Sequence, residues 1–187
     1  MTLENHVRIQ KAVSIGTASQ ILQVFWPDFV EVDGCFYARF QYAGGPVKQL
    51  SDGKTETECF INHTHIFDEF RNEATREEIE NVSEELEVVE EFYDTSHPDF
   101  ITACEIGREM ARMWALKLKL DFPQHRFRVY YTQYDNPIVR FHMVRMDEAL
   151  WLTDEALRCS SEPSFRDAMI FDTDYLQRPV TKELRPH

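Results

Sequence analysis

The feature that most constrains the fold is a long amphipathic pattern between two prolines, Pro98 and Pro123. Apolar residues recur within it at 3.6-residue spacing and charged residues fill the opposite side, as in a helix with one buried face. Proline is favoured in the first turn of a helix and is common just beyond its end. The pattern therefore predicts a central helix from about 98 to 120 that buries one stripe of residues: Phe100, Cys104, Ala111, Trp114 and Leu118.

Gly107 lies on the same apolar stripe. A glycine inside a helix costs about 1 kcal/mol relative to alanine, so its use there needs a reason. We expect another part of the chain to approach the helix backbone closely at this position.

Two segments have the pattern of β-hairpins. Asp33 and Gly34 separate two short runs rich in β-forming residues, and this dipeptide tolerates the positive φ angles of a type I′ turn. Further along, residues 125–132 alternate between polar and apolar types, a turn is expected at 134–137, and residues 138–145 supply the partner strand. Each hairpin is predicted to be antiparallel.

Capping patterns predict the remaining helices. Thr17, Thr55 and Thr75 are each followed three residues later by Gln or Glu, the spacing of a capping box. We expect helices over the ranges 17–26, 55–71, 75–92 and 147–158. The helix over 75–92 would have one apolar seam, at Ile79, Val82, Leu86, Val89 and Tyr93.

The order of these elements predicts the fold class. A helix, a hairpin, several helices and a second hairpin indicate an α+β fold, with an antiparallel sheet built from two hairpins and packed against helices. With 187 residues and no linker-like or repeated segment, the chain is expected to form a single domain over 1–187. Its C-terminal tail, from about 159 to 187, is expected to be largely irregular.

Composition excludes several classes of protein. No stretch approaches the roughly 20 apolar residues of a membrane span, and a net charge of −13 disfavours nonspecific binding to nucleic acid or to an anionic membrane. The four cysteines show no metal-binding spacing, and the first ten residues lack the pattern of a secretory signal. We therefore expect a cytoplasmic protein with reduced cysteines, no structural metal and no cofactor.

The acidic residues are concentrated in one segment. Residues 68–94 contain 12 Asp or Glu and 2 Arg, so this segment holds −10 of the net −13. One interpretation is a solvated surface that keeps the protein soluble. The other is a docking surface for a basic protein partner, because a surface of one sign steers oppositely charged partners.

On the predicted helix, i,i+4 and i,i+3 spacing places four glutamates on one outer strip, which we predict to contact the partner: Glu80, Glu84, Glu87 and Glu91. An acidic protein of this kind could be an inhibitor or an immunity-like protein that neutralises a basic partner. A variant of this interpretation is a mimic of nucleic acid that offers carboxylates in place of phosphates.

Two short patterns could bind metal but are weak indications. His63 and His65 would share one face of a strand and could then hold a metal, whereas on a helix they would diverge. The capping box at Thr55 favours the helix. Asp172 and Asp174 have the spacing of a DxD pair, with nothing beside them in sequence to complete a site.

The second hairpin supports an alternative, enzymatic function. It carries basic residues that could hold an anionic small molecule or phosphodiester and move a proton: His125, Arg128, Arg140 and His142. Polar residues also alternate along any strand that faces solvent, and no GxSxG, GxGxxG, HExxH or Walker A motif is present. The sequence therefore favours a binding protein over an enzyme.

Overall fold

The computed structural model describes residues 14–45, 53–70, 74–83, 86–133, 136–159 and 167–174, and for 75–92 and 158–159 the backbone alone. The helices are α1 (Ile15–Phe25), α2 (Lys54–Ile61), α3 (Ile66–Glu69), α4 (Pro98–Asp121) and α5 (Asp154–Cys159). The strands are β1 (Phe29–Val32), β2 (Cys35–Ala38), β3 (Thr64–His65), β4 (Thr75–Ser83), β5 (Leu86–Tyr93), β6 (Phe127–Thr132), β7 (Ile138–Met143) and β8 (Met169–Asp172). The predicted α+β class is confirmed.

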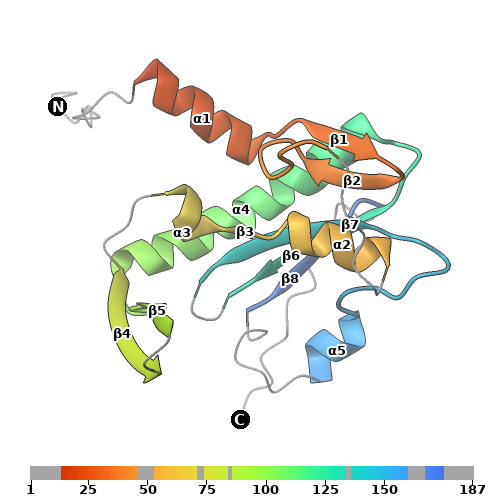
Figure 1. Ribbon diagram of the computed structural model, residues 1–187. Helices are drawn as coiled ribbons and strands as arrows, with labels where there is room; N and C mark the ends of the chain where they lie inside the picture. Colours follow the sequence, from red (N-terminus) through yellow and green to blue (C-terminus); the bar gives the residue numbers. More distant parts are fainter. Residues whose placement is uncertain are drawn as a thin grey trace, which may run out of the picture.

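All strand pairs are antiparallel, and they form three sheets (Figure 1). The main sheet has the order β3-β7-β6-β8, while β1-β2 and β4-β5 are separate two-stranded sheets. Both predicted hairpins form, in different sheets. Asp33 and Gly34 have φ angles of 53° and 74°, as a type I′ turn requires. The second hairpin closes between Thr132 and Ile138, and residues 134–135 of its turn lie outside the described residues.

Helix α4 matches the sequence prediction. His97 is its N-cap and Pro98 occupies its first turn, and the five residues predicted to be buried are all buried. A Cβ atom added to Gly107 would lie 2.7 Å from a ring carbon of Tyr131. The expected close approach at Gly107 is therefore confirmed, and the approaching group is a side chain of the main sheet.

The main sheet separates two apolar layers. On one face, α4 packs against inward residues of the sheet that include Phe127 and Phe141. On the other face, a smaller cluster joins Tyr130 of the sheet to Cys59 of α2 and to Leu157 of α5. Figure 1 shows α4 and α2 on opposite sides of the sheet.

The small sheet β1-β2 closes one end of the core through aromatic contacts. Phe29 packs edge-to-face on Trp114 and Phe141, with ring centroids 6.1 and 5.2 Å apart. The indole of Trp114 also donates a hydrogen bond of 2.8 Å to the carbonyl of Val24, which fixes the end of α1. Trp114 is thus central to three elements, α1, β1 and α4.

The predicted helix over 75–92 is wrong, because this segment forms the hairpin β4-β5. The register pairs Ile79 with Val89 and Thr75 with Tyr93, so apolar residues that fit a helical seam also fit two facing strands. β-Branched and aromatic residues favour strands, and like charges spaced i,i+4 weaken a helix. The strip that helical spacing predicted is therefore not formed: Glu80 is opposite Val88, Glu91 is opposite Glu77, and Glu84 lies outside the described residues.

Three other boundaries differ from the prediction. The helix expected over 55–71 ends at Ile61, and β3 and the short α3 follow it. The first helix begins at Ile15, because Ser14 caps it by accepting from the amide of Thr17. Within the range 147–158, the helix starts only at Asp154.

The C-terminal tail contributes to the core. Strand β8 pairs with β6, and Ile170 and Phe171 are buried; residues 160–166 and 175–187 lie outside the description. Cys35, Cys59 and Cys104 are buried free thiols. Among the described helices, none is long and apolar enough to cross a membrane.

Candidate functional site

The face of the main sheet opposite α4 carries most of the polar residues that the sequence singled out. The register pairs Arg128 with His142 and Tyr130 with Arg140, so these four residues lie on one face of β6 and β7. His125 lies before β6, where its ring packs against the β1-β2 hairpin. The structure therefore brings together three of the four predicted residues and separates His125 from them.

Arg128 is neutralised within the chain. Its Nε and Nη2 atoms donate to the two carboxylate oxygens of Asp172 at 2.7 and 2.6 Å. Its Nη1 atom donates to Asp154 at 3.0 Å. The second aspartate of the DxD pair, Asp174, forms an ion pair with Arg126. These contacts hold the tail strand and α5 on the sheet.

His142 is fully buried and neutral. Its Nδ1 atom lies 2.8 Å from the carbonyl of Met143, which can only accept, so Nδ1 carries the proton. Its Nε2 atom accepts from the hydroxyl of Tyr130 at 2.8 Å. Burial lowers the pKa of His142 to about 4. At neutral pH this histidine is a polar member of the core.

Arg140 differs from the other arginines of this face. Its guanidinium lies 4.2 Å from the ring centroid of Trp151, and its Nη2 atom donates to Nε2 of His63 at 3.1 Å. The Nε atom is buried without a hydrogen-bond partner. Among the described residues, no carboxylate pairs with this side chain.

His63 and His65 lie side by side because they belong to an extended segment at β3, not to a helix. Their rings stack with centroids 4.4 Å apart, and Nδ1 of His65 lies 2.7 Å from Nδ2 of Asn136. Burial, Arg140 and His65 together lower the pKa of His63 to about 3. We name this group the Arg140 cluster, and its members are His63, His65, Asn136, Arg140 and Trp151.

The sequence pointed to parts of this cluster without joining them. The i,i+2 spacing of His63 and His65 was the available signal, but the capping box at Thr55 assigned both residues to a helix. Asn136 and Trp151 had no signal, because only tertiary structure places them beside β7. In the described part of the chain, no three His, Cys, Asp or Glu residues gather to hold a metal ion.

A second polar group joins α2 to two sheets. Glu58 is fully buried, and its carboxylate accepts from the amides of Phe36 at 2.7 Å and Met143 at 2.8 Å. Arg145 donates to both carboxylate oxygens at 2.8 Å, and also to the carbonyl of Gly34. Burial raises the pKa of the Glu58 carboxyl, whereas Arg145 and the two amides lower it. No local sequence pattern marks Glu58 as a buried ion-pair partner, because Arg145 is 87 residues away in the chain.

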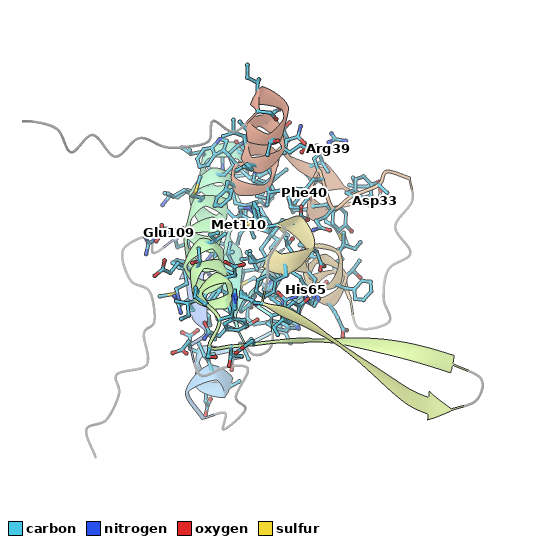
Figure 2. All side chains as sticks on the ribbon, turned by 90° about the vertical axis from the view of Figure 1, so that its left-hand side faces the viewer. Asp33, Arg39, Phe40, His65, Glu109 and Met110 are labelled. Carbon is cyan, nitrogen blue, oxygen red and sulfur yellow. The ribbon has the colours of Figure 1, made fainter. Side chains whose placement is uncertain are left out.

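The most acidic part of the chain forms a separate arm. We use the name acidic hairpin for β4 and β5, residues 75–93, whose strands pair only with each other among the described strands. Figure 2 shows this hairpin extending away from the body of the molecule. Its base is anchored: the amide of Asp94 donates to the carbonyl of buried Ala74, and the ring of Tyr93 stacks on Phe67 with centroids 4.5 Å apart.

Comparisons with models of known protein families, with characterised proteins and with solved structures find no match to this chain.

Proposed function

We propose that this protein works by binding a basic protein partner, with the acidic hairpin at the interface. The observation that supports this most directly is that the most acidic segment of the chain is also the segment that extends from the body (Figure 2). The hairpin itself, residues 75–93, contains eight Glu and one Arg, so it holds −7 of the net −10 of residues 68–94 and produces a strong local field. Such a field attracts basic surfaces and raises the rate of association.

The anchored base of the hairpin supports the same function. The contacts of Ala74 with Asp94 and of Tyr93 with Phe67 fix where the arm leaves the body. An arm with a fixed origin loses less conformational freedom on binding than an unanchored segment of the same length. The acidic residues of 75–93 would thus meet a partner from a defined position.

Charged residues on exposed strands have another use, because they prevent strand edges from pairing with other chains. This accounts for some charge in any exposed hairpin, as does solubility. Neither explanation requires nearly all the charges to have one sign, since mixed charges protect an edge equally well. The excess of acidic residues is what docking to a basic partner explains.

The alternative of an enzyme acting on an anionic molecule has less support from the geometry. Its proton carrier, His142, has no exposed surface, and Arg128 is held by Asp172 and Asp154. His125 lies apart from both. We therefore favour binding as the function.

The buried free thiols of Cys35, Cys59 and Cys104 support a cytoplasmic location, because disulfides are rare in that compartment.

The test begins with affinity purification from the native host, in which the intact chain is the bait. Association kinetics with the purified partner are then measured at low and high salt. The variant reverses four charges of the arm to lysine: Glu80, Glu84, Glu87 and Glu91. A control variant makes the same change in net charge at four exposed residues of the body: Glu31, Glu105, Asp147 and Glu155.

We expect the arm variant to associate at least about tenfold more slowly at low salt, and the control variant to change by much less. High salt should reduce the difference, because it screens exposed charges beyond roughly 8 Å at physiological strength. Equal slowing in both variants would show that only net charge matters and would reject the arm as the docking surface. Loss of the partner's own activity on binding would identify the protein as an inhibitor.

A further inference from the structure

We propose that the Arg140 cluster binds an oxyanion, the carboxylate or phosphate group of a small ligand, through the guanidinium of Arg140. The site lies on the main sheet beside β3 and shares no residue with the acidic hairpin. This inference is therefore independent of the proposed protein partner.

The first observation is a half-buried positive charge, with a buried Nε atom, that has no counter-charge among the described residues. Buried charges in proteins are normally paired, because leaving an ion unpaired away from water is costly. The neighbouring arginines follow this rule: Arg128 pairs with Asp172, and Arg145 pairs with Glu58. Arg140 pairs with no carboxylate in the described part of the chain, and burial lowers its pKa.

The second observation is the set of unused donors on Arg140. A guanidinium has five N–H groups arranged in forks that match carboxylate and phosphate oxygens. Nη2 donates to His63, while the buried Nε has no partner. Nη1 makes no hydrogen bond to the described residues either, and it is not one of the buried atoms, because the side chain is only half-buried. Nη1 is thus the unused donor that an incoming anion can reach, while the buried Nε adds to the charge that the anion would neutralise.

Trp151 fixes the orientation of these donors. The guanidinium lies over the indole ring, and an aromatic face attracts a cation without using its N–H groups. The donors therefore remain in the plane of the guanidinium, at its edges. A charged group held in one plane before binding loses little freedom when the ligand arrives.

The histidines add hydrogen-bonding capacity without adding charge. Arg140 can only donate, so Nε2 of His63 accepts and its proton is on Nδ1, where no described residue accepts it. Asn136 is 4% exposed, and its Nδ2 atom hydrogen-bonds to Nδ1 of His65. The Oδ1 atom of Asn136 has no hydrogen-bond partner. Oδ1 is an acceptor and offers nothing to an oxyanion, so the groups that support a missing anion are the unpaired donors, on Arg140 and at Nδ1 of His63.

The probes are inorganic phosphate and acetate, added to the full chain at constant pH and ionic strength. Binding is followed through the ring signals of His63 in NMR spectra and through the midpoint of thermal unfolding. A bound ligand raises the midpoint in proportion to the logarithm of its concentration above Kd. Saturation by phosphate alone would identify a phosphate ligand, and saturation by acetate alone would identify a carboxylate.

Arg140→Gln should remove the saturable response to both probes. Arg140→Lys keeps the charge but not the fork, and should weaken binding by about tenfold; it also serves if the glutamine variant does not fold. Arg112→Gln, at an exposed arginine of α4 that pairs with Glu109, is the matched control and should bind as the original protein does. Phosphate stabilises proteins nonspecifically as well, and that effect should be equal in all variants.

Two results would overturn the proposal. One is an absence of saturable shifts at His63 with either probe. The other is an equal response in the original chain, Arg140→Lys and Arg112→Gln, which would assign any effect of the anions to the protein surface in general.

Discussion

Asn62 follows Glu58 by one turn of α2, and the two side chains together bind the edge of β2 that a further strand would occupy. Glu58 accepts from the amide of Phe36, while Asn62 accepts from the amide of Ala38 and donates to the carbonyl of Phe36. Glu58 also accepts from the amide of Met143 on β7. Helix α2 thus joins two sheets that have no strand in common.

Replacing Glu58 by glutamine should destabilise the fold by about 3–5 kcal/mol. The change leaves the 7%-exposed side chain of Arg145 without a counter-charge and presents an amide NH₂ to groups that donate. Chemical denaturation measures the loss. Asp121→Asn, in the more exposed ion pair with Lys117, is the control and should cost about 1 kcal/mol or less. A similar small loss for Glu58→Gln would contradict this account of α2.

Trp114→Ala should cost about 3–5 kcal/mol, because the indole is fully buried among aromatic rings and fixes the end of α1. Trp26→Ala provides the comparison, since Trp26 is 39% exposed. We expect the Trp26 variant to lose much less stability in the same urea titration. Equal losses would show that Trp114 is not central to the core.

Gly107→Ala and Gly16→Ala should change stability in opposite directions, although both glycines lie in helices. A Cβ at position 107 would meet the ring of Tyr131 at 2.7 Å, whereas at position 16 the nearest atom is 3.9 Å away. Crowding at 107 should cost about 1–3 kcal/mol and exceed the gain in helix propensity. At position 16, alanine should gain up to about 1 kcal/mol. Thermal unfolding of both variants tests the contrast.

Acid should destabilise the protein through His142. The folded pKa is about 4, below the ordinary value of 6.5, so between these values the unfolded chain binds a proton that the folded chain does not. Stability should therefore fall as the pH decreases from about 6.5 to about 4, by about 1.4 kcal/mol per pH unit for this residue. His63, with a pKa of about 3, contributes in the same direction.

The measurement for His142 compares slopes, because carboxylates also titrate in this range. His142→Gln removes the titrating group, so its stability should depend less steeply on pH than that of the original chain. The ring signals of His142 should in addition stay unchanged between pH 5 and 8 in NMR spectra. Identical slopes, or titration near pH 6.5, would disprove the predicted protonation behaviour.

Local sequence rules were sufficient to predict an element where its backbone geometry requires particular residue types. Asp33 and Gly34 supply two positive φ angles, and few other pairs do, so the first hairpin was predictable. The same holds for α4, which has 24 residues, a proline in its first turn and a continuous apolar stripe. In both cases local preference and burial point to the same structure.

Prediction failed where local patterns were compatible with two structures. The apolar residues of 75–93 fit a helical seam and also fit facing strands, and the register that pairs Ile79 with Val89 is not visible in the sequence. The Arg140 cluster could not be predicted for a different reason. Its members come from positions 63 to 151, so only the pairing of β3 with β7 brings them together.

The position of α2 against β2 and β7 also bears on how the protein avoids association with itself. A strand in that position would form backbone hydrogen bonds with its neighbours. Its other edge would then present a further row of unpaired amides and carbonyls, with which a strand of another chain could pair. The side chains of Glu58 and Asn62 form the same hydrogen bonds to β2 and leave no such row behind. A helix therefore ends sheet growth at this edge, and a copy of the chain finds no backbone template there.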